Sequence, residues 1–185
     1  MAIVRIVAPT ITPVTLEEVK KHVIATDFTD DDDILQIYLD AAIDHLDGFS
    51  GILGRALMSQ KWAIQYPDWR ECFTLPMGPV KSFELRYFDT TNVERTVPST
   101  AYVLSGETVL LDKAFQTPGL ARRGDAISAV FTVGETDVDA VPKAIKTVIL
   151  LMVGGLYANR GQTGGQVFEN PTFDLLLGPY RRMHP

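Results

Sequence analysis

The segment from Ala144 to Tyr157 constrains the fold more than any other part of the sequence, because nearly all of its residues are apolar. Pro142 suits the first turn of a helix, and we predict a helix over residues 143–157. At 3.6 residues per turn the apolar side chains surround this helix, so it must be buried on every side. The burial can come from the core of a monomer or from a neighbouring subunit.

The second possibility predicts an oligomer whose subunit contacts lie on this helix. Gly154 and Gly155 would let another backbone come close, although a glycine inside a helix costs about 1 kcal/mol. The predicted interface residues are Ile145, Val148, Leu151, Met152, Gly154 and Gly155.

Bulk composition limits the class of protein. The 185 residues suffice for one domain, or for one domain with an insertion. The formal charge of −6 argues against a protein that coats DNA, because phosphate binding needs a concentrated Lys and Arg surface. The longest apolar stretch, residues 147–158, is too short for a membrane span, which needs about 20 residues. We therefore expect a soluble protein, made in the cytoplasm, with no membrane partner.

Cys72 is the only cysteine, which rules out an internal disulfide and a cysteine-rich zinc site. Because it stands beside Phe73, we expect it to be a small buried hydrophobic residue. The apolar run at the N-terminus is too short for a signal peptide. These features fit a reducing cytoplasm.

The first part of the chain is predicted to be helical. Thr15-Leu16-Glu17-Glu18 is a capping box, and it begins a short helix that ends near Val23. A second, longer helix is expected from Asp31 to Leu53, where apolar residues recur at helical spacing. Its apolar stripe comprises Leu35, Leu39, Ala42 and Leu46, and glycines at 48, 51 and 54 weaken and stop it.

Between residues 58 and 134 the pattern changes to short runs of β type separated by turn residues. The predicted strands are residues 59–66, 82–89, 93–97, 102–104, 108–111 and 127–133. We therefore expect an α+β fold, a discontinuous helical bundle with an inserted antiparallel β module. Its parts are residues 1–57 (helical), 58–134 (β-rich) and 135–185 (helical, completing the first part).

An aspartate cluster at residues 27–33 is the sharpest local signal for chemistry. Carboxylates bind hard cations, so the cluster could form a calcium or magnesium site. An EF-hand loop counted from Asp27 fails, however, because Asp32 stands where glycine is needed and Tyr38 where glutamate is needed. Carboxylates at the start of a helix also accept free N–H groups and suit the positive end of the dipole. We therefore favour helix capping over metal binding.

Other catalytic patterns are missing from the sequence. The glycines at 161–165 lack the Gly-Lys-Ser/Thr ending of a phosphate loop, and no Gly-x-Ser-x-Gly elbow occurs. The histidines at 22, 45 and 184 have no ligand spacing, and we expect His45 to be a core or interface residue. We predict no enzymatic activity, no cofactor and no metal.

The C-terminal region is predicted to hold a short helix over residues 172–177, followed by Pro179-Tyr180-Arg181-Arg182. Tyrosine and arginine are enriched where proteins bind one another. This segment is a candidate docking surface.

Six segments, taken in order, resemble the head–tail connector (adaptor) proteins of tailed bacteriophages, a family also found in prophages and gene transfer agents. They are TLEEVKKHV at 15–23, DDDIL at 31–35, GRALMSQKW at 54–62, LPMGPVKS at 75–82, VPKAIK at 141–146 and YANR at 157–160. Each segment is unspecific alone, but together they cover the chain from about residue 14 to 182.

The resemblance implies a homo-oligomeric ring in the virion neck, typically of twelve subunits, beneath the portal protein. It implies that the ring extends the channel through which DNA passes, and that a stopper or tail-completion protein binds its other side. It implies no cofactor and no catalysis. By the same resemblance, portal docking is expected at Phe173, Leu176, Tyr180, Arg181 and Arg182.

Three alternatives remain open at this point. The chain could be another neck or tail-completion protein, or a chaperone that leaves before the particle matures. The third alternative is a metal-dependent hydrolase that uses Asp27, Asp30, Asp31 and Asp33.

Overall fold

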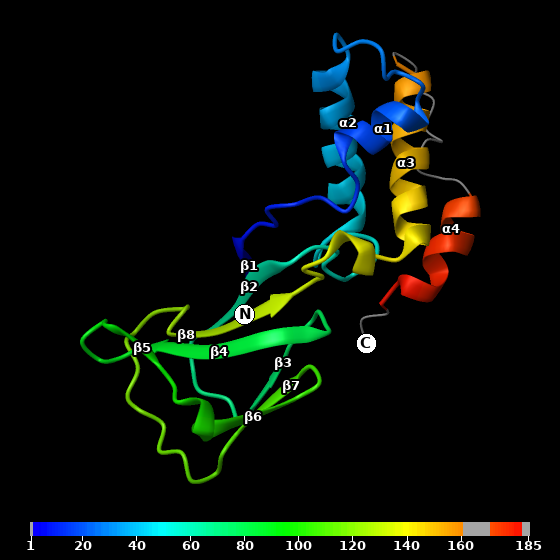
Figure 1. The fold of residues 1–185 in the computed structure, drawn as a ribbon. Coiled ribbons are helices and arrows are strands. Elements are labelled where there is room, and N and C mark those ends of the chain that lie inside the picture. The colour runs from blue at the N-terminus through cyan, green and yellow to red at the C-terminus, as the bar shows by residue number, and fades with distance from the viewer. Residues whose placement is uncertain (1, 161–170, 183–185) are drawn as a thin grey trace. The chain divides into compact units, whose positions relative to one another are not determined.

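The computed structural model describes residues 2–160 and 171–182 (Figure 1). The chain divides into two compact units, each built from two separate stretches. The β unit consists of Met1–Thr10 and Ser59–Gly134, and the helical unit of Ile11–Met58 and Glu135–Pro185. Helices and antiparallel sheets are thus both present, and the predicted α+β class is confirmed.

The larger sheet of the β unit has five antiparallel strands. In spatial order they are β1 (Ala2–Val7), β2 (Gln60–Tyr66), β8 (Ile127–Val133), β4 (Val80–Phe88) and β5 (Glu94–Thr96). The central strand β8 lies in register between β2 and β4, and most of its side chains are buried. Strands buried on both faces are rich in Val, Ile and Phe, as the sequence of β8 is.

A smaller sheet packs against one face of the larger one. It contains β3 (Cys72–Thr74), β7 (Thr108–Leu111) and β6 (Tyr102–Ser105), and a short 3-10 helix, η1 (Ser99–Ala101), leads into β6. Phe73 is fully buried and its ring meets Tyr66 of the larger sheet at 5.4 Å, edge to face. The ring of Tyr102 meets Phe83 at 5.1 Å in the same manner. These aromatic pairs fix the two sheets against each other.

All six predicted strands are present, but β1 and β3 were not predicted. Residues 1–57 were assigned to the helical part, yet β1 pairs with β2, so the first ten residues belong to the β unit. The expectation for Cys72 is also wrong, since this side chain is exposed. Side chains alternate along a strand, so the burial of Phe73 turns its neighbour outward.

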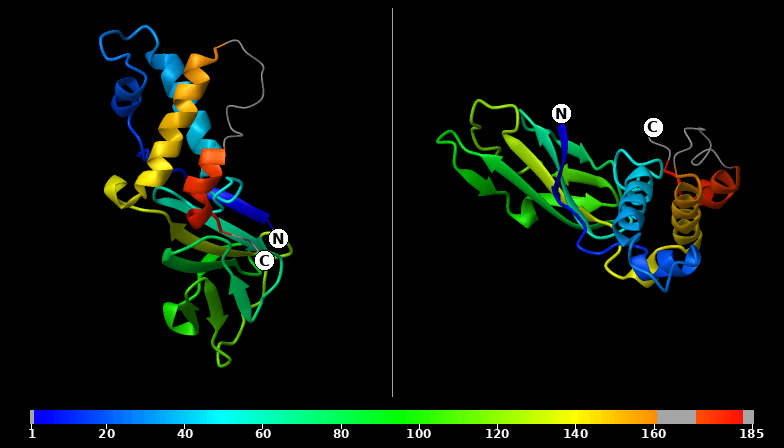
Figure 2. Two further views of the ribbon diagram at one scale, coloured as in Figure 1. Left: turned by 90° about the vertical axis from the view of Figure 1, so that its right-hand side faces the viewer. Right: turned by 90° about the horizontal axis from the view of Figure 1, so that it is seen from above.

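In the part of the helical unit that the structure describes there are four α-helices: α1 (Leu16–His22), α2 (Asp32–Leu46), α3 (Lys143–Ala158) and α4 (Pro171–Leu177). Two 3-10 helices, η2 (Val138–Ala140) and η3 (Gly178–Tyr180), precede α3 and follow α4. The predicted capping box is confirmed: Thr15 Oγ1 accepts a hydrogen bond from the Glu18 backbone, and Glu18 accepts one from the Thr15 backbone. Within this unit α3 lies between α2 and α4 (Figure 2).

Helix α2 ends at Leu46, seven residues earlier than predicted. Gly48 has a φ of +78°, a left-handed conformation that glycine adopts without steric cost and that ends a helix. Its backbone N–H donates to the Arg55 carbonyl at 2.9 Å, and Asp47 Oδ1 accepts from the Leu57 N–H at 2.6 Å. The chain beyond Leu46 is therefore a hydrogen-bonded turn, not helix.

The core of the helical unit joins segments that are far apart in the sequence. The apolar stripe predicted for α2 is buried, and it packs with the inward side chains of α3 and with Phe173 and Leu177 of α4. No helix within residues 2–160 and 171–182 is both long and apolar enough to span a bilayer.

Candidate assembly surfaces

The six residues predicted for subunit contacts lie in different environments on α3. Ile145, Val148 and Met152 are buried in the core of their own unit, with at most 1% exposure. Leu151 faces outward and is 37% exposed, while Gly154 and Gly155 are half-buried. The apolar circumference of this helix is therefore covered mainly by the chain itself. The interface prediction stays a prediction, and of the six predicted residues only Leu151 and the two half-buried glycines are accessible to a neighbouring subunit.

Gly154 lies against another element of the same unit. A Cβ atom at this position would stand 3.2 Å from His22 Nε2, closer than side chains usually approach. The close approach that a glycine permits is therefore between α3 and the end of α1. His22 was not singled out as part of this contact, because no spacing in the sequence links it to Gly154.

The predicted docking residues surround α4 and η3. Phe173 is buried in the helical core, Leu176 and Tyr180 are half-buried against it, and Arg181 is exposed. Arg181 Nη2 donates to Asp174 Oδ1 at 2.7 Å, an exposed ion pair of modest strength. The Arg182 backbone N–H donates to the Leu53 carbonyl at 3.0 Å, which anchors this end of the chain on the turn after α2.

Asp31 connects the start of α2 to the end of α3. Its Oδ2 accepts hydrogen bonds from the Tyr157 hydroxyl at 2.6 Å and from Arg160 Nη2 at 2.9 Å. The Arg160 guanidinium also stacks on the Tyr157 ring at 3.9 Å. The Tyr157 hydrogen bond, followed by that of Arg160, lowers the pKa of Asp31. We call these three residues the Asp31 latch.

The structure corrects one part of the expectation for the aspartate cluster, namely that the N-cap carboxylate accepts a hydrogen bond from the helix backbone. Asp32 and Asp33 do lie in the first turn of α2, where negative charge suits the helix dipole. Asp31 occupies the N-cap position of α2, but its side chain accepts no hydrogen bond from the helix backbone. Asp32 pairs with Lys20 of α1 at 2.6 Å. Asp31 and Asp32 therefore connect α2 to the end of α3 and to α1 through hydroxyl and cationic partners. In the described part of the chain, no group of three His, Cys, Asp or Glu residues is placed to hold a metal ion.

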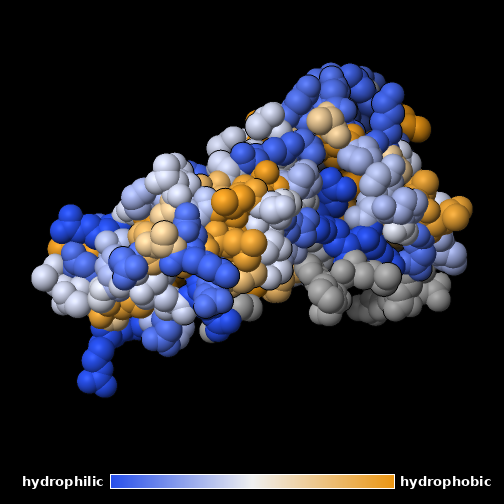
Figure 3. Space-filling model, turned by 90° about the horizontal axis from the view of Figure 1, so that it is seen from below, coloured by the Kyte–Doolittle hydropathy of each residue, from blue (hydrophilic) through white to orange (hydrophobic). Residues whose placement is uncertain are grey.

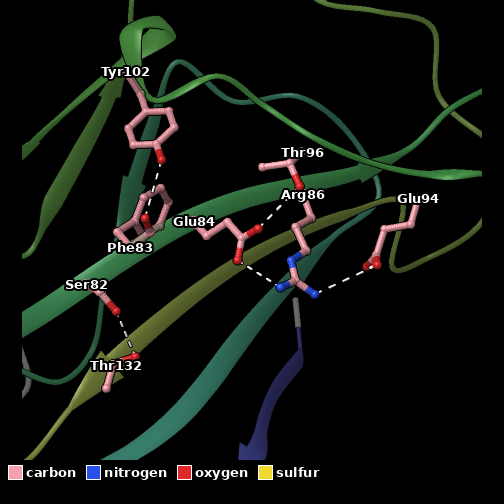
Figure 4. Close-up of polar contacts among 8 residues, drawn as sticks. All are labelled: Ser82, Phe83, Glu84, Arg86, Glu94, Thr96, Tyr102 and Thr132. Carbon is pink, nitrogen blue, oxygen red and sulfur yellow. Dashed lines mark hydrogen bonds and ion pairs between the residues drawn. The ribbon is translucent and has the colours of Figure 1, made fainter.

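A polar network lies along β4 and β5 in the other unit (Figure 4). Arg86 donates to Glu84 at 2.8 Å and lies 3.8 Å from Glu94, while the Thr96 hydroxyl donates to Glu84 at 3.3 Å. The Arg86 hydrogen bond is the main cause of the lowered pKa of Glu84. Tyr102 donates to a β4 carbonyl at 3.4 Å. The pair Arg86–Glu84 lies within β4, and the contacts with Glu94 and Thr96 join β4 to β5, which fits a structural role.

Exposed apolar side chains collect on the smaller sheet, a feature that we did not predict. Val103 of β6 is 65% exposed, and it stands in register with Leu110 of β7, which in turn faces Cys72 of β3. Figure 3, seen from the side of this sheet, shows hydrophobic residues gathered among hydrophilic ones. Strands β6 and β7 were predicted as elements, but only their pairing with β3 shows which side chains share the outer face.

No protein-family model matches the chain, and no curated protein matches it. Several solved structures, however, match the chain over its whole length. A chain from the neck of an empty gene transfer agent (GTA) particle, computed with C6 symmetry, superposes with a TM-score of 0.75 at 23% identity. A chain from the virion of a native GTA particle gives 0.77 at 22% identity. A chain from the neck of a native GTA particle, computed with C12 symmetry, gives 0.76 at 22% identity. Each match covers 100% of this chain and 97% of the other.

The fold is that of a GTA neck protein. The likeness extends over both units and over the order of their elements, since neither chain has a long unmatched segment. The predicted resemblance to a connector family that includes gene transfer agents is thus confirmed at the level of the fold.

Proposed function

We propose that this chain is a structural subunit of a ring in the neck of a tailed, virus-like particle. The full-length match with GTA neck proteins is the observation that carries this proposal. The C6 and C12 symmetries belong to those neck structures, and they support a ring of twelve copies here. A closed ring uses a heterologous interface, so each subunit needs two different contact surfaces.

Within the neck, the proposed position is that of an adaptor between the portal protein and a stopper or tail-completion protein. DNA would pass through the ring without sequence-specific binding. The acidic helical unit supports this, because it carries 8 Lys and Arg residues against 15 Asp and Glu residues. The outward side chains of α2 include Asp33, Asp40 and Asp44, and α2 contains no Lys or Arg. Such a surface repels phosphates and does not hold DNA in place.

For portal docking we propose the end of the helical unit formed by α4 and η3. Arg181 is exposed there, and Leu176, Tyr180 and Arg182 are half-buried beside it. Phe173 supports this surface from inside the core. An aromatic and arginine surface of this kind is typical of protein-binding sites.

We propose no catalytic role, no cofactor and no metal for this subunit. The rival hydrolase would need the aspartates at 27–33 as metal ligands, but Asp31 and Asp32 are engaged by Tyr157, Arg160 and Lys20. Calorimetry with calcium, magnesium and manganese tests this. Micromolar binding that Asp31→Ala abolishes would favour the hydrolase.

Cryo-electron microscopy of purified particles tests the main proposal. We expect twelve copies of the chain in a ring against the portal. Absence from mature particles would instead indicate a transient chaperone, and a position further from the portal would indicate a stopper or another tail-completion protein.

Mixing the purified chain with the portal protein tests the docking surface. Arg181→Glu should weaken the complex, whereas Arg122→Glu, at an exposed arginine of the β unit, is the matched control. Equal binding by both variants would contradict docking through η3.

A further inference from the structure

The edges of the two sheets differ in how well they are protected. An unprotected edge strand offers free N–H and C=O groups to another strand, so proteins shorten their edges or place charges on them. Strand β5 has three residues, including exposed Glu94 and Arg95, and β3 also has three residues. Strand β1 has six residues, of which only Arg5 is charged, and β6 has four uncharged ones. Two of the four edges are therefore open.

The open edge at β6 continues into an uncharged surface. The outer face of the smaller sheet carries two rows of residues in register across β3, β7 and β6. The rows are Cys72–Leu110–Val103 and Thr74–Thr108–Ser105, and they contain no charged side chain. A flat surface of this kind, next to a free edge, fits an extended apolar segment better than a charged partner.

The open edge at β1 is also mainly apolar, although it carries one exposed charged residue, Arg5, whose guanidinium lies 5.9 Å from the centre of the Trp62 ring. Its exposed side chains include Val4, Ile6 and Val7, and Ile6 is 51% exposed. The strand is hydrogen-bonded to β2 on one side only, because it is the last strand of its sheet. A strand that buries so little within its own unit gains much from a second partner.

The two open edges lie on opposite sides of the β unit. The ring of Phe73 places β3 under β2, which is the neighbour of β1. The ring of Tyr102 places β6 under β4, which is the neighbour of β5. Figure 2 shows β1 on one side of the larger sheet and β4 and β5 on the other. One subunit can therefore present β1 to a neighbour on one side and β6 to a neighbour on the other.

We propose that β1 of one subunit pairs with the β6 edge of a second copy of this chain, head to tail around the ring. This rests on the proposed ring and assigns its contact surface. The charge balance supports the choice of a second copy, because the β unit has 9 Lys and Arg residues against 8 Asp and Glu residues. Nearly neutral units approach one another without the repulsion that separates acidic ones.

A charge placed on the β6 edge tests the proposal. Val103→Lys adds an ammonium group to an exposed position, so the fold should tolerate it, but the position would face the neighbouring strand. Val93→Lys, in the turn between β4 and β5, is the control, since Val93 is 46% exposed and lies outside both open edges. We expect Val103→Lys to raise the concentration needed for ring formation roughly tenfold or more and Val93→Lys to leave it unchanged.

Cysteine crosslinking identifies which strand pairs with the β6 edge. In a Cys72→Ser background, Val103→Cys is combined with Val4→Cys or with Ile6→Cys, and particles or rings are oxidised. Paired strands hold opposite Cβ atoms about 4.5–5.5 Å apart, close enough for a disulfide at one of the two combinations. We expect a ladder of covalent oligomers from that combination, and only monomers from each single cysteine.

The outcomes separate this inference from the proposed function. Dimers from Val4→Cys alone would indicate symmetric pairing of β1 with β1, which overturns the head-to-tail arrangement. The pairing of β1 with β6 would also be overturned if rings form neither crosslink and tolerate Val103→Lys as well as wild type does. The proposed neck ring would not be affected by that result. Absence of the wild-type chain from purified particles would instead refute the proposed function.

Discussion

The two units of this protein differ in their charge and in where their exposed apolar side chains lie. The helical unit contains the most apolar helix of the chain and covers most of it with its own α1, α2 and α4, while its exterior is strongly acidic. The β unit is almost neutral, and its exposed apolar side chains lie mainly along strands β1, β6 and β7. The helical unit also exposes apolar side chains, such as Ile24, Ile37 and Leu175, but these lie on separate segments. The most hydrophobic segment of a sequence is therefore not necessarily the surface through which the protein assembles.

This difference has an electrostatic consequence for a ring. The helical unit has seven more acidic than basic residues, so copies of this unit repel one another in the proposed ring. The β unit has nearly equal numbers of basic and acidic residues, so its copies repel one another little. We therefore expect the attraction between subunits to come from the β unit, while the helical unit contributes an acidic surface.

The largest expected effect concerns the core of the helical unit. Met152→Ala removes a buried side chain from α3 and should lower the free energy of unfolding by about 2–5 kcal/mol. Leu151→Ala, at the preceding position, should lower the free energy of unfolding much less, because Leu151 already faces solvent.

Urea denaturation followed by circular dichroism measures both variants. Both tryptophans, Trp62 and Trp69, lie in the β unit, so their fluorescence reports that unit separately. If the two substitutions lower the free energy of unfolding equally, α3 is not covered by its own unit. The contrast drawn between the helical unit and the β unit would then be wrong.

The next effect separates the two units as assembly surfaces. Leu151→Asp should weaken ring formation by roughly tenfold or less, because it adds a charge at one partly exposed position of α3. Val103→Lys on β6 should weaken it more. Sedimentation over a range of concentrations measures both. If Leu151→Asp abolishes rings that Val103→Lys leaves intact, the helical unit carries the contacts after all.

Much of this fold was predictable from local sequence. The capping box at Thr15 and the alternation in β2 and β8 act over a few residues, and the structure confirms them. Strand β1 was missed because an edge strand exposed on both faces shows no clear alternation, and its partner β2 begins more than fifty residues later. The early end of α2 depends on the left-handed backbone at Gly48, which composition does not reveal.

The candidate surfaces depend still more on long-range contacts. Asp31 meets Tyr157 and Arg160 across 126 and 129 residues, so its local sequence indicated only helix capping or metal binding. The exposure of Cys72 follows from the burial of Phe73 beneath the larger sheet. In the same way, periodicity identified α3 as a helix that must be buried, but only its packing shows that the chain itself buries it.

The dependence of assembly on salt concentration tests the charge difference between the helical unit and the β unit. If apolar strand pairing attracts and acidic helical units repel, raising the ionic strength screens the repulsion and strengthens assembly. We expect the concentration needed for ring formation to fall a few-fold between about 0.05 and 0.5 M salt. Light scattering across a salt series measures this. Weaker assembly at high salt would instead point to ion pairs between subunits.

The smallest effect is expected at the Asp31 latch, which acts inside the helical unit alone. Asp31→Asn keeps the size of the side chain but removes the charge that attracts Arg160. The pKa of Asp31 is lowered in the folded chain, so its charge stabilises the fold fully above the ordinary carboxyl value of 3.8. That contribution is lost as the pH falls through the lowered pKa.

Wild type should therefore be slightly more stable than Asp31→Asn at pH 7, and the difference should vanish in acid as the Asp31 carboxylate becomes protonated. Denaturation of both proteins at a series of pH values measures it, with circular dichroism reporting the helices and tryptophan fluorescence the β unit. Asp33→Asn is the matched control, because Asp33 is an exposed aspartate of the same cluster in the first turn of α2. A difference between wild type and Asp31→Asn that persists unchanged in acid would mean that charge plays no part in the latch. A change in the tryptophan signal alone would mean that Asp31 acts outside the helical unit.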